Sequence, residues 1–124
     1  MPAYVAGKVI SLIPGEFGYS FNAETYATPP QAGQAFYMGG PGNKGQIQGS
    51  LQVYLPTTPG AFEVDVQESD IDVDAAYVTI GSGITTVNAS GYGVQDFSTG
   101  CQFVRSKLTS LTNSGPVTAI ILNR

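Results

Sequence analysis

The segment Ala61–Gln67, with the sequence AFEVDVQ, alternates apolar and polar residues along its length. Neighbouring side chains of an extended strand point to opposite faces, so the apolar set and the polar set occupy different sides. The apolar set is Phe62, Val64 and Val66, and the polar set is Glu63, Asp65 and Gln67. This alternation predicts an antiparallel strand with one face on a core and the other in water.

Short runs rich in β-branched and aromatic residues recur along the chain and are separated by Gly, Pro, Asn and Ser. No window keeps the spacing of an amphipathic helix without an interrupting Gly or Pro. We therefore predict an all-β protein, an antiparallel β-sandwich of jelly-roll-like organisation. The expected strands are Tyr4–Ile13, Phe17–Phe21, Ala35–Met38, Ser50–Leu55, Ala61–Gln67, Ala76–Ile80, Ile84–Asn88, Gly93–Phe97, Cys101–Leu111 and Val117–Leu122.

Turn residues indicate how these strands are connected. The adjacent prolines in Thr28–Gln34 predict a loop, because proline lacks the N–H that a central strand needs. The segment Pro56–Gly60 has the length of a hairpin link, and the turn at Thr112–Gly115 predicts a hairpin between the last two strands.

Residues 1–47 are richer in Gly and Pro and less regular than residues 48–124. We expect residues 1–47 to form an N-terminal arm or a peripheral sheet, and residues 48–124 to form the sandwich core of one compact domain. The run Tyr4–Ile13 can pair within its own domain or add to the sheet edge of a neighbouring molecule. Both alternatives remain open.

Composition excludes several classes of function. The chain has five basic residues and a net charge of −4, which argues against nucleic-acid binding, since that needs clustered Lys and Arg. It has no His and a single cysteine, Cys101, which removes the common nucleophilic triads and zinc ligand sets. No apolar run has the length of a membrane span or a signal peptide, so we expect synthesis in a host cytoplasm without membrane insertion. We predict no enzymatic activity and no cofactor.

Carboxylates recur at every second position after the alternating segment, at Glu68, Asp70, Asp72 and Asp74. Asp70, Asp72 and Asp74 match the first, third and fifth positions of a calcium-binding loop. Ala75 replaces the Gly required at the sixth position, and Gly81 replaces the Glu at the twelfth, which excludes an EF-hand. A looser calcium site is one alternative. The other is a solvated row of like charges that discourages unwanted edge pairing.

Charged residues form 11% of the chain, against about 25% in ordinary soluble domains. A surface of neutral polar groups is typical of a protein that packs against other proteins. Candidate interface residues are aromatic side chains beside glycine or turn residues and apolar side chains of the N-terminal run, although partial burial under loops would also explain any one of the rings. They are Tyr19, Tyr26, Tyr37 and Tyr92, with Tyr4, Val5, Val9 and Ile10.

The C-terminal half contains GAFEVDVQESDIDVDAAYVTIGS, GITTVNASGYGVQDF and QFVRSKLTSLTNSGPVTAIILNR. It resembles the small β-sandwich virion structural proteins of tailed bacteriophages. The matching positions are the strand end Phe103–Arg105, the turn Thr109–Thr112 and the last apolar strand, Val117–Leu122. The resemblance covers about half of the chain and implies a fold rather than a reactive site.

The resemblance implies a capsid decoration (cement) protein at the capsid surface of the virion. Its expected partners are the major capsid protein and sister copies in a homo-oligomer, such as a trimer. Two alternatives remain at the level of function. One is a phage-borne module that binds host surface glycans, and the other is a minor tail or baseplate component.

Overall fold

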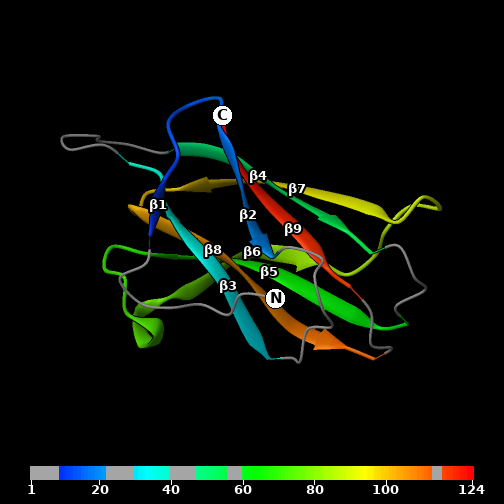
Figure 1. The fold of residues 1–124 in the computed structure, drawn as a ribbon. Helices are drawn as coiled ribbons and strands as arrows, with labels where there is room; N and C mark the ends of the chain where they lie inside the picture. The colour runs from blue at the N-terminus through cyan, green and yellow to red at the C-terminus, as the bar shows by residue number, and fades with distance from the viewer. Residues whose placement is uncertain (1–8, 22–29, 40–46, 56–59, 113–115) are drawn as a thin grey trace.

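The computed structural model describes residues 9–21, 30–39, 47–55, 60–112 and 116–124. These residues form two β-sheets and one short 3-10 helix, η1 (Figure 1). The strands are β1 (Ile10–Ser11), β2 (Phe17–Phe21), β3 (Gln31–Tyr37), β4 (Ile47–Tyr54), β5 (Phe62–Ser69), β6 (Val78–Ile84), β7 (Tyr92–Thr99), β8 (Phe103–Leu111) and β9 (Thr118–Asn123). The helix η1 spans Asp74–Ala76, between β5 and β6.

The strand order is that of a jelly roll. Sheet A has the order β1-β3-β8-β5-β6, and sheet B has the order β2-β9-β4-β7. The antiparallel pairs β5–β6, β4–β7, β3–β8 and β2–β9 are nested in the sequence and alternate between the two sheets. The chain thus behaves as one long hairpin wrapped around a core, which is how jelly rolls are built. The strand β1 is an addition that pairs with β3 in parallel.

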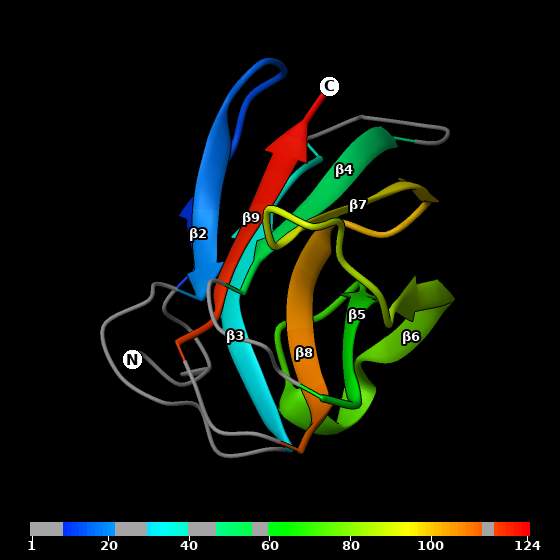
Figure 2. The ribbon, with the colours of Figure 1, turned by 90° about the vertical axis from the view of Figure 1, so that its right-hand side faces the viewer.

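This topology confirms the predicted sandwich but changes its connections. The strands β8 and β9 lie in different sheets, so the turn after Leu111 does not close a hairpin. The same holds for β4 and β5. In both cases, strands that follow one another in the sequence belong to opposite sheets (Figure 2). A turn motif fixes the direction of the chain locally but does not select which sheet receives the next strand.

The core lies between the two sheets and is built from the alternating apolar positions of both. In β5, Phe62, Val64 and Val66 are buried as the pattern predicts. Facing them from sheet B are Leu51 and Val53 of β4, with Ala119 and Ile121 of β9, all at most 1% exposed. Burial of this apolar surface is the main favourable contribution to folding.

The sequence predicts an arm or a peripheral sheet for residues 1–47, but the described part of this range builds both sheets. The strand β2 pairs with β9 in sheet B, and β3 pairs with β8 in sheet A. Phe21 and Phe36 are completely buried in the core. Residues 31–34 are strand rather than loop, because the two prolines end before β3 begins. Two glycines of this range, Gly18 and Gly33, lie where a Cβ would collide with a residue of a neighbouring strand.

The predicted strand Ile84–Asn88 is also not formed, since β6 ends at Ile84. Gly81 and Gly83 have φ values of 71° and 78°, which favour glycine. They let β6 bend, with a shift in register against β5, while the strand continues through both of them. The expected turn between two strands is therefore an irregularity within one strand.

A buried hydroxyl joins the two sheets beside an irregular part of sheet A. The β3–β8 register shifts between Ala32 and Ala35, next to Ser106. Ser20 of β2 is fully buried and fills this gap. Its Oγ donates to the Gln34 carbonyl at 3.0 Å and accepts from the Ser106 N–H and hydroxyl at 3.1 and 2.6 Å. At Gly33, any Cβ would collide with the Ser20 carbonyl oxygen.

A second polar contact between the sheets lies at the opposite end of β9. Asn123 is 1% exposed, and its Nδ2 donates to the Leu12 carbonyl at 2.7 Å and to the Met38 carbonyl at 3.4 Å. These two carbonyls belong to segments that continue β1 and β3 of sheet A. The two polar contacts hold the β2 and β9 side of sheet B against sheet A.

We predict that Ser20→Ala lowers the free energy of unfolding by about 2–3 kcal/mol, because it leaves the Ser106 N–H buried without its acceptor. Ser98→Ala is the matched control, since Ser98 is exposed on β7, and it should change stability by less than about 0.5 kcal/mol. Urea unfolding followed by circular dichroism measures both. Equal effects of the two substitutions would contradict the role assigned to Ser20.

Candidate interaction surfaces

The four regularly spaced carboxylates do not lie on one face in the structure. The strand β5 ends at Ser69, whose Oγ accepts from the Ile71 N–H at 3.1 Å and donates to the Ile71 carbonyl at 2.6 Å. This local turn competes with strand continuation, as serine hydroxyls commonly do. The chain then passes into η1 at Asp74. The period-two pattern is therefore not an extended row of charges.

Each carboxylate that makes a contact has a different partner. Glu68 accepts from the Thr99 hydroxyl at 2.6 Å, and Asp72 accepts from the Tyr77 hydroxyl at 2.8 Å. Asp74 forms an ion pair with Arg105 at 2.8 Å. Within the described residues, no three His, Cys, Asp or Glu side chains are placed to hold a metal ion. The structure does not support the calcium alternative for Asp70, Asp72 and Asp74.

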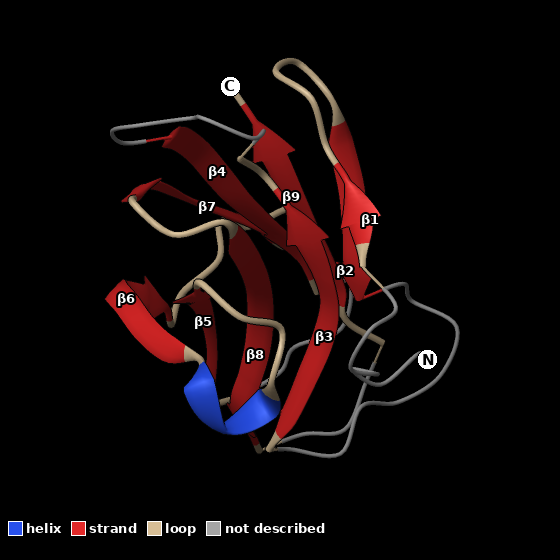
Figure 3. Ribbon diagram, turned by 90° about the vertical axis from the view of Figure 1, so that its left-hand side faces the viewer, coloured by secondary structure: helices blue, strands red, loops and turns tan. Residues whose placement is uncertain are grey.

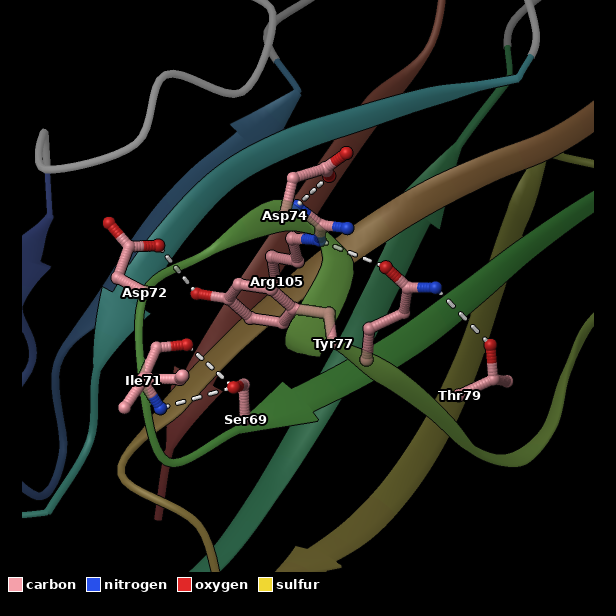
Figure 4. A network of polar contacts seen from close by, with 8 residues as sticks. Ser69, Ile71, Asp72, Asp74, Tyr77, Thr79 and Arg105 are labelled. Carbon is pink, nitrogen blue, oxygen red and sulfur yellow. Dashed lines mark hydrogen bonds and ion pairs between the residues drawn. The ribbon is translucent and has the colours of Figure 1, made fainter.

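Arg105 fastens the segment after β5 to the outer side of sheet A (Figure 4). Its guanidinium lies over the Tyr77 ring, 4.0 Å from the ring centroid, and its Nε donates to Gln67 Oε1 at 2.9 Å. Gln67 Nε2 in turn donates to the Thr79 hydroxyl at 3.4 Å. Arg105 is 2% exposed although it points away from the core. Stacking on an aromatic face and directed hydrogen bonds are interactions that arginine makes well.

The prediction that the polar face of β5 is exposed to water was wrong. Asp65 and Gln67 point away from the core as the alternation requires, but each is 6% exposed. Asp65 Oδ2 accepts from the Thr109 hydroxyl of β8 at 2.8 Å. A hydrogen bond to Asp65, together with its negative charge, raises the pKa of Glu63 above the usual range. The polar side of β5 is therefore a second packed layer.

The opposite side of the sandwich presents a large apolar surface. We call it the outer face of sheet B. It consists of Phe17 and Tyr19 of β2, Thr118, Ile120 and Leu122 of β9, Gln52 and Tyr54 of β4, and Tyr92 and Val94 of β7. The pairing register places Tyr19, Ile120, Gln52 and Val94 in one row across the four strands.

Several of these side chains are as exposed as surface residues although they are apolar or aromatic. Phe17 is 56% exposed, Tyr19 48%, Tyr92 54% and Val94 60%. The rings pair with one another: Tyr54 stacks on Tyr92 with centroids 4.5 Å apart, and Phe17 meets Tyr19 edge-on at 6.0 Å. Contiguous exposed apolar surface of this kind marks interaction sites in soluble proteins.

The outer face of sheet B contains a hollow, and none of the nine residues named above is charged. The hollow has a volume of about 290 Å³ and is lined by Phe17, Gln52, Ile120 and Leu122. Asp96 lies on the same side of sheet B, two residues after Val94 and in one row with Leu122 and Phe17, and it pairs with Arg124 at 3.2 Å. The remaining polar groups are an amide and hydroxyls, so the face is both apolar and neutral.

The structure brings only some of the predicted interface residues together. Tyr19 and Tyr92 lie on the outer face of sheet B, whereas Tyr37 is half-buried and packs on Phe103 of sheet A at 5.4 Å. Ile10 is 53% exposed on β1, and Val9 is half-buried just before it. Tyr4, Val5 and Tyr26 lie outside the described residues.

Sequence reasoning missed most of the outer face of sheet B. The missed residues are Phe17, Gln52, Tyr54, Val94, Thr118, Ile120 and Leu122. Ile120 and Leu122 occupy alternate positions in β9, which is apolar on both sides, so the pattern alone does not tell which side faces the core. A signal was present in β9, whose continuous apolar run indicates a strand covered on both faces.

Ile71 and Val73 form a smaller exposed apolar pair on the side of sheet A. They are 58% and 51% exposed and alternate with the carboxylates of the segment that Arg105 fastens. The helix that follows them lies over sheet A, away from β4, β7 and β9 (Figure 3). The protein thus exposes apolar side chains on two separate sides.

No protein-family model matches this chain, and no curated protein matches it. Among the described residues, no helix is long and apolar enough to cross a membrane. The surfaces described above are therefore interpreted from their own chemistry.

We predict that Arg105→Met lowers the free energy of unfolding by about 2–3 kcal/mol, because it removes the hydrogen bond to Gln67 and the stacking on Tyr77. Asp74→Asn should have an effect below about 1 kcal/mol, because the Asp74 side chain is 74% exposed and water screens its ion pair. Lys107→Met, two residues further along β8, controls for the loss of a positive charge. Urea unfolding compares the three variants, and a larger effect of Asp74→Asn would contradict this ranking.

Cys101 is expected to be an unreactive thiol. Burial and the nearby carboxylates Glu68 and Asp70 raise its pKa to about 11. The thiolate is the reactive form, so alkylation by iodoacetamide at pH 8.5 should be at least about tenfold slower in the folded protein than in urea. Since the folded protein holds this proton more tightly, its stability should fall as the pH rises from about 8.5, the pKa of an unfolded thiol, to about 11. Asp70→Asn should speed alkylation; an unchanged rate would argue against the electrostatic cause.

Proposed function

We propose that this protein is a non-enzymatic virion structural protein of a tailed bacteriophage, of the capsid decoration type, which acts by binding other proteins. The proposal rests mainly on the outer face of sheet B. This face exposes Phe17, Tyr19, Tyr92 and Val94 without a charged group among them. A protein that worked as an isolated monomer would gain nothing from such a surface, whereas an assembly component buries it.

The fold agrees with this proposal at the level of analogy. Jelly rolls occur in viral capsid proteins and also in lectins, so the strand order alone does not choose between them. The C-terminal strands resemble those of small phage virion proteins, as described above. The low fraction of charged residues, 11%, also favours a protein that is packed among others.

A cement function would be mechanical. Internal pressure pushes the subunits of a filled capsid apart, and additional buried interface between neighbouring subunits opposes their separation. A useful contact would bury on the order of 1,000 Å² per copy. The sandwich suits this task because Ser20 and Asn123 link its two sheets through buried hydrogen bonds.

Two separate apolar surfaces allow one molecule to contact two neighbours at once. The outer face of sheet B is one surface, and the pair Ile71 and Val73 is the other. Linking two contacts through a rigid body raises the overall affinity without new interactions. Asp70, Asp72 and Asp74, which alternate with Ile71 and Val73, favour a shell surface that carries basic side chains.

Glycan binding remains a second candidate because of the stacked pair Tyr54 and Tyr92. The two rings are stacked with their planes inclined by 26°, and Gln52 offers an amide beside them. Aromatic rings with an adjacent polar group can anchor a sugar as well as a protein. A glycan-array signal that Tyr92→Ala abolishes would favour this candidate over capsid binding.

We predict that the protein is present in purified virions of the phage that encodes it at hundreds of copies, as quantitative mass spectrometry would show. Added to shells that lack it, the purified protein should bind and raise their disruption temperature. Ile71→Asp should weaken this binding by about tenfold or more, because it places a charge in an apolar contact. A handful of copies would indicate a tail or baseplate component, and absence from virions would overturn the proposal.

A further inference from the structure

The outer face of sheet B combines a ridge with a hollow. The ridge is formed by Tyr92 and Val94 of β7, the two residues of this strand that are 54% and 60% exposed. The hollow over β9 has a volume of about 290 Å³. Small-molecule sites usually measure roughly 300–1,000 Å³ and are more enclosed, so this hollow suits a protruding side chain better than a ligand.

We propose that a second copy of this chain covers the outer face of sheet B, with the ridge of each copy seated over the hollow of the other in a two-fold dimer. A two-fold interface uses the same patch on both subunits, so the patch must complement itself. This one does, because it offers both the protruding and the receiving part. The inference builds on the assembly role proposed above, although its test requires no virion.

Charge favours a sister copy over an unrelated partner. Two copies with a net charge of −4 repel each other unless they meet where neither carries charge. The outer face of sheet B meets this condition closely, since its nine residues are uncharged and Asp96, on the same side of β7, is neutralised by its ion pair with Arg124. A partner selected by opposite charge would find only this ion pair, which has no net charge, beside an apolar surface.

The polar groups on the face are also compatible with a copy of themselves. The Gln52 amide and the hydroxyls of Thr118, Tyr19 and Tyr92 each contain a donor and an acceptor. When two identical faces meet, each of these groups can therefore form a hydrogen bond with its counterpart, because one donates and the other accepts. Carboxylates or ammonium groups in the same positions would face their own kind across a two-fold axis.

The area is sufficient for a dimer of moderate affinity. The strands β2, β9, β4 and β7 have five, six, eight and eight residues, and at about 3.3 Å per residue and about 4.8 Å between strands they project to about 430 Å². The accessible area of a side-chain surface exceeds its projection. It therefore approaches the roughly 600 Å² per partner at the lower end of stable interfaces. A dissociation constant in the micromolar range, roughly, is expected from an interface of this size.

Sedimentation velocity of the full chain tests the proposal at concentrations from about 1 to 200 µM, which bracket the expected affinity. The wild-type protein should shift from 12.9 kDa to twice that mass as concentration rises. Val94→Asp should weaken the dimer by about a hundredfold or more, because the ridge would carry an unpaired charge into an apolar hollow. Ile71→Asp is the matched control: Ile71 has nearly the same exposure, 58% against 60%, but lies on the other side of the sandwich.

A charge-pair rescue tests the ridge-to-hollow arrangement itself. Gln52→Lys places a positive charge in the hollow and should also give a monomer when alone. Mixed with Val94→Asp, it should form a heterodimer, in which one contact gains an ion pair and the other retains the native Val94 and Gln52. Both residues are exposed, so circular dichroism should show both variants folded.

The outcomes separate this inference from the proposed function. A wild-type protein that stays at 12.9 kDa throughout, or a dimer that Ile71→Asp dissociates and Val94→Asp does not, would overturn the dimer. A monomer whose binding to shells is lost in Val94→Asp would show that the shell itself covers this face. A concentration-dependent dimer absent from virions would keep the inference and overturn the virion role.

Discussion

The arrangement of the two sheets depends on satisfying buried polar groups at one irregular place, the register shift between β3 and β8. An unpaired backbone N–H in a core is expensive, so a shift inside a sandwich requires a partner from elsewhere. Ser20 supplies it from the other sheet and accepts from the Ser106 N–H while donating to the Gln34 carbonyl. The core must close around this junction, which is why Gly33 has no room for a side chain.

With the two sheets fixed in this way, the outer sides of the sandwich differ in how far the chain covers them. The outer side of sheet A is covered by the segment that follows β5, because Arg105 stacks on Tyr77 and bonds to Gln67. The chain thereby uses one of its few cations to build a packed layer over its own polar strand. Within the described residues, sheet B has no corresponding cover from the chain, and its outer face remains apolar and exposed. The asymmetry between the two sides is the basis for assigning one of them to a partner.

Much of the fold could be predicted from the sequence, and the errors share a physical origin. Alternation in β5 correctly placed Phe62, Val64 and Val66 in the core, and the strand-rich pattern gave the sandwich class. The prediction of hairpins after Leu55 and Leu111 was wrong, because the residues of a turn do not determine which sheet the next strand joins. The burial of Arg105 could not be predicted from the sequence pattern, because it depends on contact with Tyr77, which lies in a different segment of the chain.

The candidate surfaces were harder to predict than the core for a related reason. A strand that is apolar on both sides, such as β9, indicates that both of its faces are covered. The pattern does not indicate which part of the protein, or which partner, covers each face. Ile121 is buried against sheet A, whereas its neighbours Ile120 and Leu122 point to the other side, where they line a hollow. In a monomer these side chains would have no reason to be apolar. Their chemistry therefore indicates a cover that the described residues do not provide, and we infer that a copy of the same face supplies it.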